Sequence, residues 1–394
     1  MADASGPPVI RLKISRNSDH PWIYRRMVAK EAGRGVDPGS VVRVEDRDGR
    51  AVGQAFWNPR SEIALRLLST DATVRVDRAF FASAIRRAVS LRHDVLRLPE
   101  TTDAYRLVNS EADGLSGLVA DRYADAIVLE LYSAGYFEIL EDLEVIFGEL
   151  FPGSTFHVRS DWKIEKIEGF RTHWKQSPSR SVVVKENGVR FHVDLALGHK
   201  TGFFLDQRDN RYFLGTLARG RSVLDCFCYT GGFALHAAKA GAAAVTAVDL
   251  DEKAIAVARG NAELNGAAVN FIHSDVFPFL RGLEGKPPAH DVIVLDPTKL
   301  AHSKEDLPRA SRAYMDMNRL AMAVIRPEGI LVSCSCSGKL SEDDFLSILR
   351  RAARESRREL EVFRVAGAGG DHPVASSCPE GRYLKVVFSR VRPL

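Results

Sequence analysis

The sequence predicts a mixed α/β protein with a doubly wound, parallel sheet in its C-terminal half. Two observations predict this fold class. After about residue 200, short apolar runs without polar alternation take turns with helical stretches, as expected for parallel strands that helices cover on both faces. Before that point β-rich runs come first, and a mixture of helices and strands follows them. We therefore predict a β-rich domain over residues 1–72, an α+β domain over 73–195 and the doubly wound domain over 196–394.

The first domain contains a clear hairpin signal. Strand-like runs cover Val41–Glu45 and Ala51–Trp57. Asp48-Gly49 lies between them, and this dipeptide is typical of tight hairpin turns because both residues tolerate positive φ. Asn58-Pro59 ends the second run, since proline cannot donate a ladder hydrogen bond. These features predict a small β-barrel or sheet.

The second domain mixes helical and strand-like patterns. Apolar residues recur at helical spacing over Arg78–Leu98 and over Tyr136–Leu150, so we expect two helices. Three strands are expected between and after them, at Leu118–Tyr123, Ala126–Leu131 and Thr155–Arg159. The pattern predicts an α+β module.

A second hairpin leads into the third domain, with Asn187-Gly188 between Val182–Lys185 and Val189–Leu195. The third domain then offers five candidates for buried parallel strands, at Val223–Cys226, Val245–Val248, Val269–Ile272, Val292–Leu295 and Ile330–Ser333. A ligand of such a sheet binds beyond the carboxyl ends of its strands. The residues that follow each run are therefore the candidates for a site.

Composition excludes several classes of protein. The chain has 394 residues, 55 basic and 51 acidic side chains, a net charge of +4 and 45% apolar residues, which rules out a disordered or collagen-like chain. No run reaches the ~20 apolar residues of a membrane span, and Met1–Leu12 has no apolar leader segment, so we expect a cytoplasmic protein that does not bind a membrane. Five cysteines, an odd number, favour thiol chemistry over disulfides.

The segment after the first parallel strand predicts a cofactor site. Asp225 ends the strand, and Tyr229, Thr230 and Gly231 precede a helix over Phe233–Lys239. Glycine lets the backbone approach a ligand, and a helix N-terminus offers unpaired N–H groups. The pattern G-x-G-x-x-G, which a pyrophosphate cofactor would prefer, is absent from the sequence.

Acidic residues also follow the next two strands. Asp249 can accept both hydroxyls of a ribose, and Asp275 can accept an adenine amino group while Val276 and Phe277 cover the ring. Three acids at successive strand ends, without a phosphate-binding pattern, favour S-adenosylmethionine over NAD or ATP, because its sulfonium is cationic and it carries no phosphate. A strand-end aspartate can instead serve only as the N-cap of the following helix.

The fourth and fifth strands end in residues suited to pyrimidine methylation. Asp296 follows the fourth strand and Cys336 the fifth. Carbon 5 of cytosine is a poor nucleophile until a thiolate adds to C6, which makes C5 an enamine carbon that can accept a methyl group. We predict that Cys336 is this nucleophile and that Asp296 bonds the base edge and stabilises charge on the ring.

Less specific explanations exist for several of these residues. Cys226 and Cys334 are interpreted as small apolar residues of buried strands. The two C-x-C pairs depart from zinc spacing and have no neighbouring histidine, so no metal is expected. An arginine cluster is interpreted as the solvated face of a helix rather than an RNA contact, and consists of Arg350, Arg351, Arg354, Arg357 and Arg358.

Several stretches of the sequence are recognisable as a set: Lys200–Arg208, Asp225–Gly232, Ser335-Cys336-Ser337, Asp371-His372-Pro373 and Pro379–Lys385, together with His20-Pro21-Trp22 and Asn109–Leu115. Through them nearly the whole chain resembles the bacterial family of large-subunit (23S) ribosomal RNA cytosine-5 methyltransferases. The resemblance implies an N-terminal PUA RNA-binding domain, a central domain and a Rossmann-like methyltransferase domain. It also implies S-adenosylmethionine as cofactor, ribosomal RNA as substrate, Cys336 as nucleophile, and Gln207 and Arg208 beside the cofactor.

One stretch departs from that family's pattern. Thr298 replaces the second proline of Asp-Pro-Pro, and Leu300 replaces an aromatic residue that could stack on a base. Two rival functions therefore stay open: a methyltransferase that acts on an exocyclic nitrogen or a small molecule without a covalent adduct, and a non-catalytic RNA-binding factor of ribosome assembly. A homodimer also stays open, because the sequence does not decide the oligomeric state.

Overall fold

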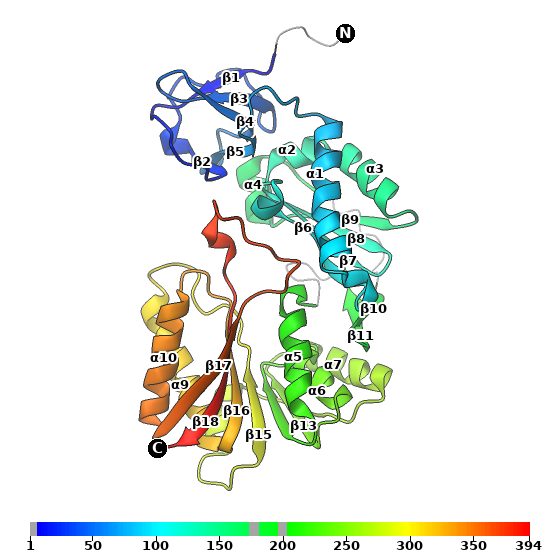
Figure 1. Ribbon diagram of the computed structural model, residues 1–394, viewed down its shortest axis with the longest axis vertical. Coiled ribbons are helices and arrows are strands. Elements are labelled where there is room, and N and C mark those ends of the chain that lie inside the picture. The colour runs from blue at the N-terminus through cyan, green and yellow to red at the C-terminus, as the bar shows by residue number, and fades with distance from the viewer. Residues whose placement is uncertain (1–5, 173–180, 196–202) are drawn as a thin grey trace. The chain divides into compact units, whose positions relative to one another are not determined.

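The computed structural model describes residues 6–172, 181–195 and 203–394 and divides the chain into two compact units (Figure 1). Each unit is made from separate stretches of sequence. Unit 1 comprises Met1–Val182, Asp194–His199 and Asp371–Gly381, and unit 2 comprises Val183–Val193, Lys200–Gly370 and Arg382–Leu394. A short stretch near the C-terminus thus returns to unit 1 before the last strand completes unit 2.

Unit 1 begins with a five-stranded sheet in the order β1-β3-β4-β5-β2. Its strands are β1 (Val9–Arg11), β2 (Trp22–Tyr24), β3 (Val41–Glu45), β4 (Ala51–Trp57) and β5 (Ile63–Ser69). β3 and β4 form the predicted antiparallel hairpin with the predicted bounds. Gly49 in its turn has a φ of 79°, in the left-handed region that favours glycine. The β-rich prediction for this segment is confirmed.

The rest of unit 1 is an α+β module around a four-stranded sheet in the order β6-β7-β8-β9. The strands are β6 (Ala104–Asn109), β7 (Leu118–Tyr123), β8 (Ala126–Leu131) and β9 (Thr155–Arg159), and the helices are α1 (Arg78–Ser90), α2 (Ala134–Glu138), α3 (Leu140–Leu150) and α4 (Trp162–Glu168). All three predicted strands have the predicted bounds, and β6 was not predicted. Tyr105, Leu129 and Phe147 lie in the shared core.

The two predicted helices of this module differ from the observed ones. The helix expected over Arg78–Leu98 ends as an α-helix at Ser90, and Leu91–Val95 forms a π-helical turn. Arg92 explains the change, because its buried guanidinium donates to the Ala88 carbonyl, which the next helical turn would otherwise use. The helix expected over Tyr136–Leu150 is divided at residue 139, whose φ of −108° lies outside the helical range.

Unit 2 is built on a seven-stranded sheet in the order β14-β13-β12-β15-β16-β18-β17. The strands are β12 (Ser222–Cys226), β13 (Ala244–Asp249), β14 (Asn270–His273), β15 (His290–Leu295), β16 (Ile325–Ser335), β17 (Arg358–Ala366) and β18 (Lys385–Pro393). The first five are parallel, as predicted. β17 and β18 were not predicted; β18 pairs antiparallel with both β16 and β17.

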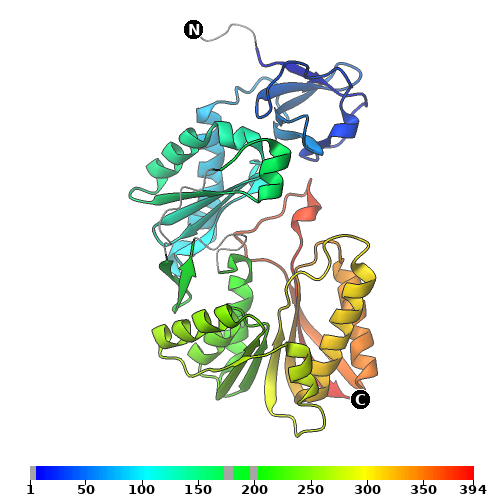
Figure 2. The ribbon, with the colours of Figure 1, turned by 180° about the vertical axis from the view of Figure 1, so that it is seen from behind.

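Helices cover both faces of this sheet, as Figures 1 and 2 show. One face carries α5 (Arg208–Ala218), α6 (Gly232–Lys239) and α7 (Glu252–Asn265), and the other carries α8 (Val276–Arg281), α9 (Leu307–Val324) and α10 (Glu342–Glu355). Residues of β12, β15, β16 and α8 to α10 share one buried core. The predicted doubly wound architecture is therefore confirmed.

A separate two-stranded sheet pairs β10 (Ser181–Glu186) with β11 (Val189–Asp194). Asn187 and Gly188 form its turn, with φ values of 48° and 84° that match the predicted tight hairpin. Within the described part of the chain, no helix combines the length and the apolar character that crossing a membrane requires.

Candidate active site

The carboxyl ends of five parallel strands bring the predicted site residues to one edge of the unit 2 sheet. β12 pairs with β13 on one side and with β15 on the other, and β16 lies beyond β15. Asp225, Asp249 and Asp296 lie at or just after the ends of β12, β13 and β15, and Cys336 follows β16. The strand order thus places these four side chains along one edge.

The loop after β12 has an unusual backbone. Phe227, Tyr229 and Gly231 have φ values of 64°, 50° and 88°, so three of five successive residues are left-handed. The two aromatic residues are strained in this conformation, and such strain is typical of functional loops. Hydrogen bonds to β13 hold the loop, from the Tyr229 N–H to Asp249 Oδ2 (2.8 Å) and from the Cys228 N–H to the Val248 carbonyl (3.1 Å).

A buried ion pair supports the helix that follows this loop. The Arg211 guanidinium donates two hydrogen bonds to Glu186 (2.7 and 2.6 Å), and His236 Nε2 lies 3.0 Å from the same carboxylate. Although burial alone would raise it, the pKa of Glu186 falls to about 2 because of Arg211 and His236. A Cβ on Gly232 would lie 2.9 Å from Arg211 Cδ, so this glycine lets α6 begin against the arginine.

Two of the predicted cofactor ligands already bind backbone groups. Asp249 accepts the N–H groups of Tyr229 and Asp251 (2.9 Å), one on each oxygen, and each oxygen keeps a second lone pair. Asp275 is exposed and caps α8 by accepting the Phe277 N–H (2.8 Å), which is the N-cap alternative considered for it. Leu250, beside Asp249, exposes 65% of its surface.

Asp225 is completely buried rather than open to solvent. Its Oδ2 accepts the Ala234 N–H of α6 (2.9 Å), and burial raises the pKa of its carboxyl well above the usual value. Thr230 is also buried, and its carbonyl accepts a hydrogen bond from Asn261 (3.0 Å). Gly231 is the N-cap residue of α6. These residues shape the loop from within.

The predicted pair at the start of α5 reaches the same edge. Gln207 Nε2 donates to Asp296 Oδ2 (3.1 Å), which joins the segment before α5 to the end of β15. Arg208 is buried, and its Nε contacts Asp209 (3.1 Å). Burial, followed by the nearby Asp206 carboxylate, raises the pKa of Asp296 to about 7. Residues 200–202 of the same motif lie outside the described residues.

A group of buried acceptors near this edge lacks hydrogen-bond donors. Among the described residues, no donor reaches Asp206 Oδ1, Asn210 Oδ1 or Asp225 Oδ1. Asn210 Nδ2 donates to Gln207 Oε1 (2.8 Å), and Gln207 in turn binds Asp296. Asp206 and Asp225 both interact electrostatically with Asp296, so the three atoms belong to one neighbourhood. Buried acceptors without donors are costly unless a ligand supplies them. The ammonium of S-adenosylmethionine can donate hydrogen bonds to such acceptors, its sulfonium adds a positive charge without a donor, and these residues fit that cofactor.

Hydroxyl groups fix the turn that carries Cys336. The Tyr314 hydroxyl of α9 hydrogen bonds with Ser335 (3.0 Å) and Ser337 (3.1 Å), and Ser337 Oγ accepts the Ala301 N–H (3.1 Å). Cys336 Sγ lies 3.9 Å from the carbonyl of Pro297, the residue after Asp296. The structure therefore brings the half-buried Cys336 next to the segment of Asp296.

The other cysteines of unit 2 are buried. Cys226 and Cys334 have 0% and 1% exposure, and burial raises the pKa of both thiols well above the usual value. All five cysteines have free thiols in this structure. Cys226 therefore behaves as the small apolar residue that we expected, whereas the Cys334 thiol also hydrogen bonds with the side chains of Asp296 and Gln207.

One group of side chains in unit 1 has ligand atoms close enough for a metal ion. Among the described residues, His20, Cys378 and Glu380 place theirs within 4.8 Å of one another. His20 Nδ1 accepts the Trp22 N–H (3.1 Å), so the ring proton lies on Nε2, which is 3.3 Å from Glu380. This tautomer offers no ring lone pair to a metal.

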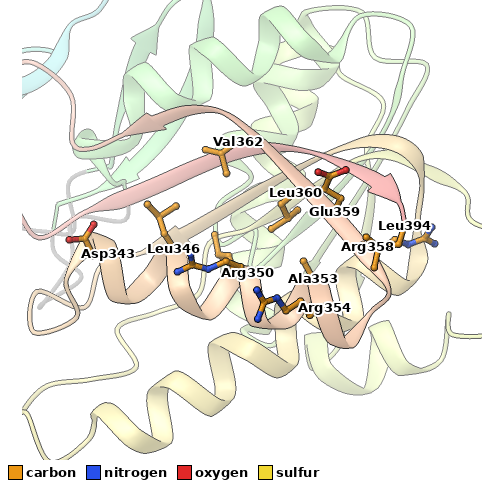
Figure 3. A pocket seen from close by; sticks show the side chains of 11 residues that line it. Asp343, Leu346, Arg350, Ala353, Arg354, Arg358, Glu359, Leu360, Val362 and Leu394 are labelled. Carbon is orange, nitrogen blue, oxygen red and sulfur yellow. The ribbon is translucent and has the colours of Figure 1, made fainter.

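A groove of unit 2 lies between α10 and β17, away from the predicted site residues (Figure 3). Its lining combines the apolar Leu346, Leu360 and Val362 with arginines. Of the predicted helix face, the exposed Arg350, Arg351 and Arg354 do lie on α10, whereas Arg357 follows that helix and Arg358 begins β17. The prediction is wrong for the last two because the helix ends at Glu355.

Sequence reasoning missed several residues of this edge. Asp206, Asn210, Tyr383 and Lys385 take part in its contacts, but no role was predicted for them. The Tyr383 hydroxyl donates a hydrogen bond to Asp206 Oδ2 (2.6 Å). Asp206 and Tyr383 lie within the stretches that carry the family resemblance, and this resemblance could have indicated that they belong to the site. The departures Thr298 and Leu300 differ in position, since Thr298 is exposed and Leu300 packs partly against the core.

Comparison with known families gives two matches. Residues 169–369 match the model of the S-adenosylmethionine-dependent methyltransferases, and residues 15–70 match that of PUA-like domains. The predicted fold class, with its Rossmann-like methyltransferase domain and its N-terminal PUA-like domain, is thus confirmed.

Relatives match over nearly the whole chain. A protein named ribosomal RNA large subunit methyltransferase I from Shewanella denitrificans is 40% identical over 394 residues, which covers 97% of this chain and 99% of the relative. A protein of the same name from Aeromonas hydrophila is 39% identical over 382 residues, with 95% and 96% covered. The solved structure of SMU.776 complexed with SAH has a TM-score of 0.79 at 21% identity, covers 97% of this chain and 100% of that one, and shares the fold.

Proposed function

Because the chain belongs to the family of the ribosomal RNA large subunit methyltransferase I proteins, we propose that it methylates C5 of a cytosine in large-subunit ribosomal RNA. Membership of the S-adenosylmethionine-dependent methyltransferases makes it an enzyme that uses this cofactor. One observation supports the choice of cytosine C5. The half-buried Cys336 lies beside Pro297, the residue after Asp296, at the edge of the sheet where buried oxygen atoms lack hydrogen-bond donors.

The cofactor roles proposed here follow the geometry of that edge. Asp249 would accept the ribose hydroxyls with its remaining lone pairs, and Asp275 would accept the adenine amino group beside Leu250. Asp225 would face the cationic end of the cofactor. The remaining predicted ligands line the same loop or the start of α5, namely Gln207, Arg208, Tyr229, Thr230 and Gly231. When bound, the cofactor supplies an electrophilic methyl group.

The proposed reaction begins at Cys336. Its thiolate forms a bond to C6 of the cytosine, and the electron pair of the 5,6 double bond becomes available at C5. C5 then takes the methyl group, a base removes the C5 proton, and the bond between Cys336 and C6 breaks to restore the ring. Asp296 in its acid form would donate a hydrogen bond to the base edge and stabilise the charge that builds up during the attack.

RNA binding would involve the other parts of the chain. We propose three domains with the predicted bounds: a PUA-like domain over 1–72, a central domain over 73–195 and the methyltransferase domain over 196–394. The match of residues 15–70 to PUA-like domains supports the first of these. The first two domains would hold structured RNA through its shape and phosphates, because double-stranded RNA offers few readable base edges.

A mechanism-based trap tests the proposal. Ribosomal RNA that contains 5-fluorocytidine should give a denaturant-resistant adduct with the wild-type enzyme and S-adenosylmethionine, because fluorine cannot leave as a proton does. Cys336→Ala should form no adduct and lose methylation, yet bind S-adenosylhomocysteine normally in calorimetry. Cys378→Ala, which removes a cysteine of unit 1, is the matched control and should still form the adduct.

Two outcomes would contradict the proposed chemistry. Near-normal methylation by Cys336→Ala would exclude a covalent route through this sulfur. Methylation of the substituted RNA without a trapped adduct would favour an exocyclic nitrogen as the acceptor, because such a transfer needs no adduct. Mass-spectrometric mapping of ribosomal RNA from cells with and without the gene would identify the modified nucleotide.

A further inference from the structure

Lys385 lies directly beneath the turn that carries Cys336. It begins β18 and is paired with Ser335 in the antiparallel register of β16 and β18. Only 3% of its surface is exposed. Its Nζ donates to the carbonyls of Ser337 (2.7 Å) and Tyr383 (2.9 Å). Its backbone pairs with Ser335, which precedes Cys336, and its amine binds the carbonyl of Ser337, which follows Cys336, so the lysine contacts the backbone on both sides of the cysteine.

A buried ammonium is costly unless neighbouring groups compensate. Burial lowers the pKa of Lys385 to about 8, and Cys336 acts in the opposite direction by favouring the charged amine. Such coupling is reciprocal: a thiolate that stabilises an ammonium is stabilised by it to the same extent. Nucleophilic cysteines need this help, because an ordinary thiol with a pKa of about 8.5 is only a few per cent ionised near neutral pH.

We propose that the Lys385 ammonium is the counter-ion of the Cys336 thiolate and so acts as a positioning residue for the nucleophile. The proposal rests on the proposed function only in taking Cys336 as the nucleophile. When the thiolate forms, the S–H bond breaks, the electron pair stays on sulfur and the proton passes to water. Lys385 keeps its three protons throughout and holds two of them on the two carbonyls.

Other charged or titratable groups surround the pair. Lys299, after β15, and Glu342, at the start of α10, act on Lys385 with opposite sign, and Tyr314 of α9 interacts with Cys336 and with Asp296. Lys299 is exposed, so water and salt screen its charge. Lys385 is buried and therefore screened much less, which singles it out as the cation that acts on the sulfur.

The rate of alkylation of Cys336 tests this role without RNA or cofactor. Iodoacetamide labelling of the full-length protein would be followed by mass spectrometry of the Cys336 peptide from about pH 5.5 to 9.5. Lys385→Met should lower the rate near neutral pH about tenfold and move the half-maximal rate to higher pH by one unit or more, as expected when an opposite charge is removed. Lys385→Arg keeps the charge and should restore most of the reactivity. Lys339→Met removes an exposed lysine near the same turn and should change nothing.

An unchanged pH profile in a folded Lys385→Met variant would overturn the proposal. If that variant does not fold, the effect of Cys336 on the titration of Lys385 can be measured instead. In protein labelled at lysine, the NMR titration midpoint of Lys385 should fall in Cys336→Ser relative to wild type, and an unchanged midpoint would again overturn it. If Lys385→Met shifts the pH profile of alkylation as expected but wild type forms no 5-fluorocytidine adduct, only the proposed cytosine chemistry is contradicted. The failure of the proposed function can therefore be distinguished from the failure of the role proposed for Lys385.

Discussion

Replacement of Asp296 by asparagine should make the protein more stable, and increasingly so as the pH rises. The carboxyl of Asp296 has a pKa of about 7, because burial and the neighbouring Asp206 disfavour its charged form. The asparagine side chain would have nearly the same shape, and its oxygen could still accept the hydrogen bond from Gln207. Asp296→Asn therefore removes the titratable carboxyl but keeps the shape of the side chain and its hydrogen bond.

The size of the effect follows from linkage. An unperturbed aspartate has a pKa of about 3.9, so the folded state raises it by about three units, which corresponds to up to about 4 kcal/mol. The folded state holds the proton more tightly than the unfolded state. The extra stability is thus fully present below pH of about 4, is lost as the pH rises, and is gone above about 7. The free-energy difference between the variant and wild type should grow over that window and then stay constant.

The assay has to follow unit 2. All four tryptophans precede residue 182, so their fluorescence does not report on this sheet. Hydrogen exchange of peptides from β12 and β15, measured by mass spectrometry on both proteins at each pH, gives the local free energy of unfolding. Asp206→Asn is the matched variant, because it keeps Asp296 but removes one cause of its raised pKa. In this variant the pH range over which Asp296 reduces the stability should be narrower than in wild type. A difference between Asp296→Asn and wild type that does not vary with pH would refute the reasoning.

Three further predictions concern the loop and its supports. Asp249→Ala should weaken S-adenosylhomocysteine binding about 10- to 100-fold in calorimetry, since hydrogen bonds to a charged group contribute about 1.5–3 kcal/mol, and unchanged affinity would contradict the ribose role. Gly231→Ala should cost about 1–3 kcal/mol and also reduce cofactor affinity, whereas Gly220→Ala, at a φ of 70° outside the loop, should affect only stability; equal affinities would contradict this. Glu186→Gln should destabilise the protein by about 3–5 kcal/mol near neutral pH, and the gap should close as the pH falls from about 4 towards 2; a gap that persists there would argue against an ionised Glu186.

The sequence predicted the parallel strands of the sheet because the apolar signal of most of them is continuous. β12, β15 and β16 are interior strands with continuous runs of buried residues, so they are recognisable without knowledge of their neighbours. β17 was missed for the opposite reason: charged residues interrupt the apolar ones throughout Arg358–Ala366. A pattern of that kind does not show where the strand begins when it directly follows a charged helix.

The site was predictable as a position but not as a set of contacts. Strand order brings Asp225, Asp249 and Asp296 to one edge, as expected for residues that end successive parallel strands. It did not show that Asp225 would be buried beneath α6 or that Asp275 would cap α8. Those outcomes depend on which backbone N–H groups face each carboxylate, and that is set by loop geometry rather than by residue type.

The proposed chemistry requires neighbouring groups in opposite states: Asp296 must keep its proton while Cys336 loses its own. Burial alone cannot produce both, because it disfavours every negative charge and raises the pKa of Cys334 as well as that of Asp296. A local positive charge is needed on one side only. Lys385 lies on the cysteine's side of the edge, held by the Ser337 carbonyl, whereas Asp296 faces the Asp206 carboxylate. The two halves of the edge therefore differ in electrostatic field, and under the proposed mechanism this difference would let a protonated Asp296 and a Cys336 thiolate coexist there.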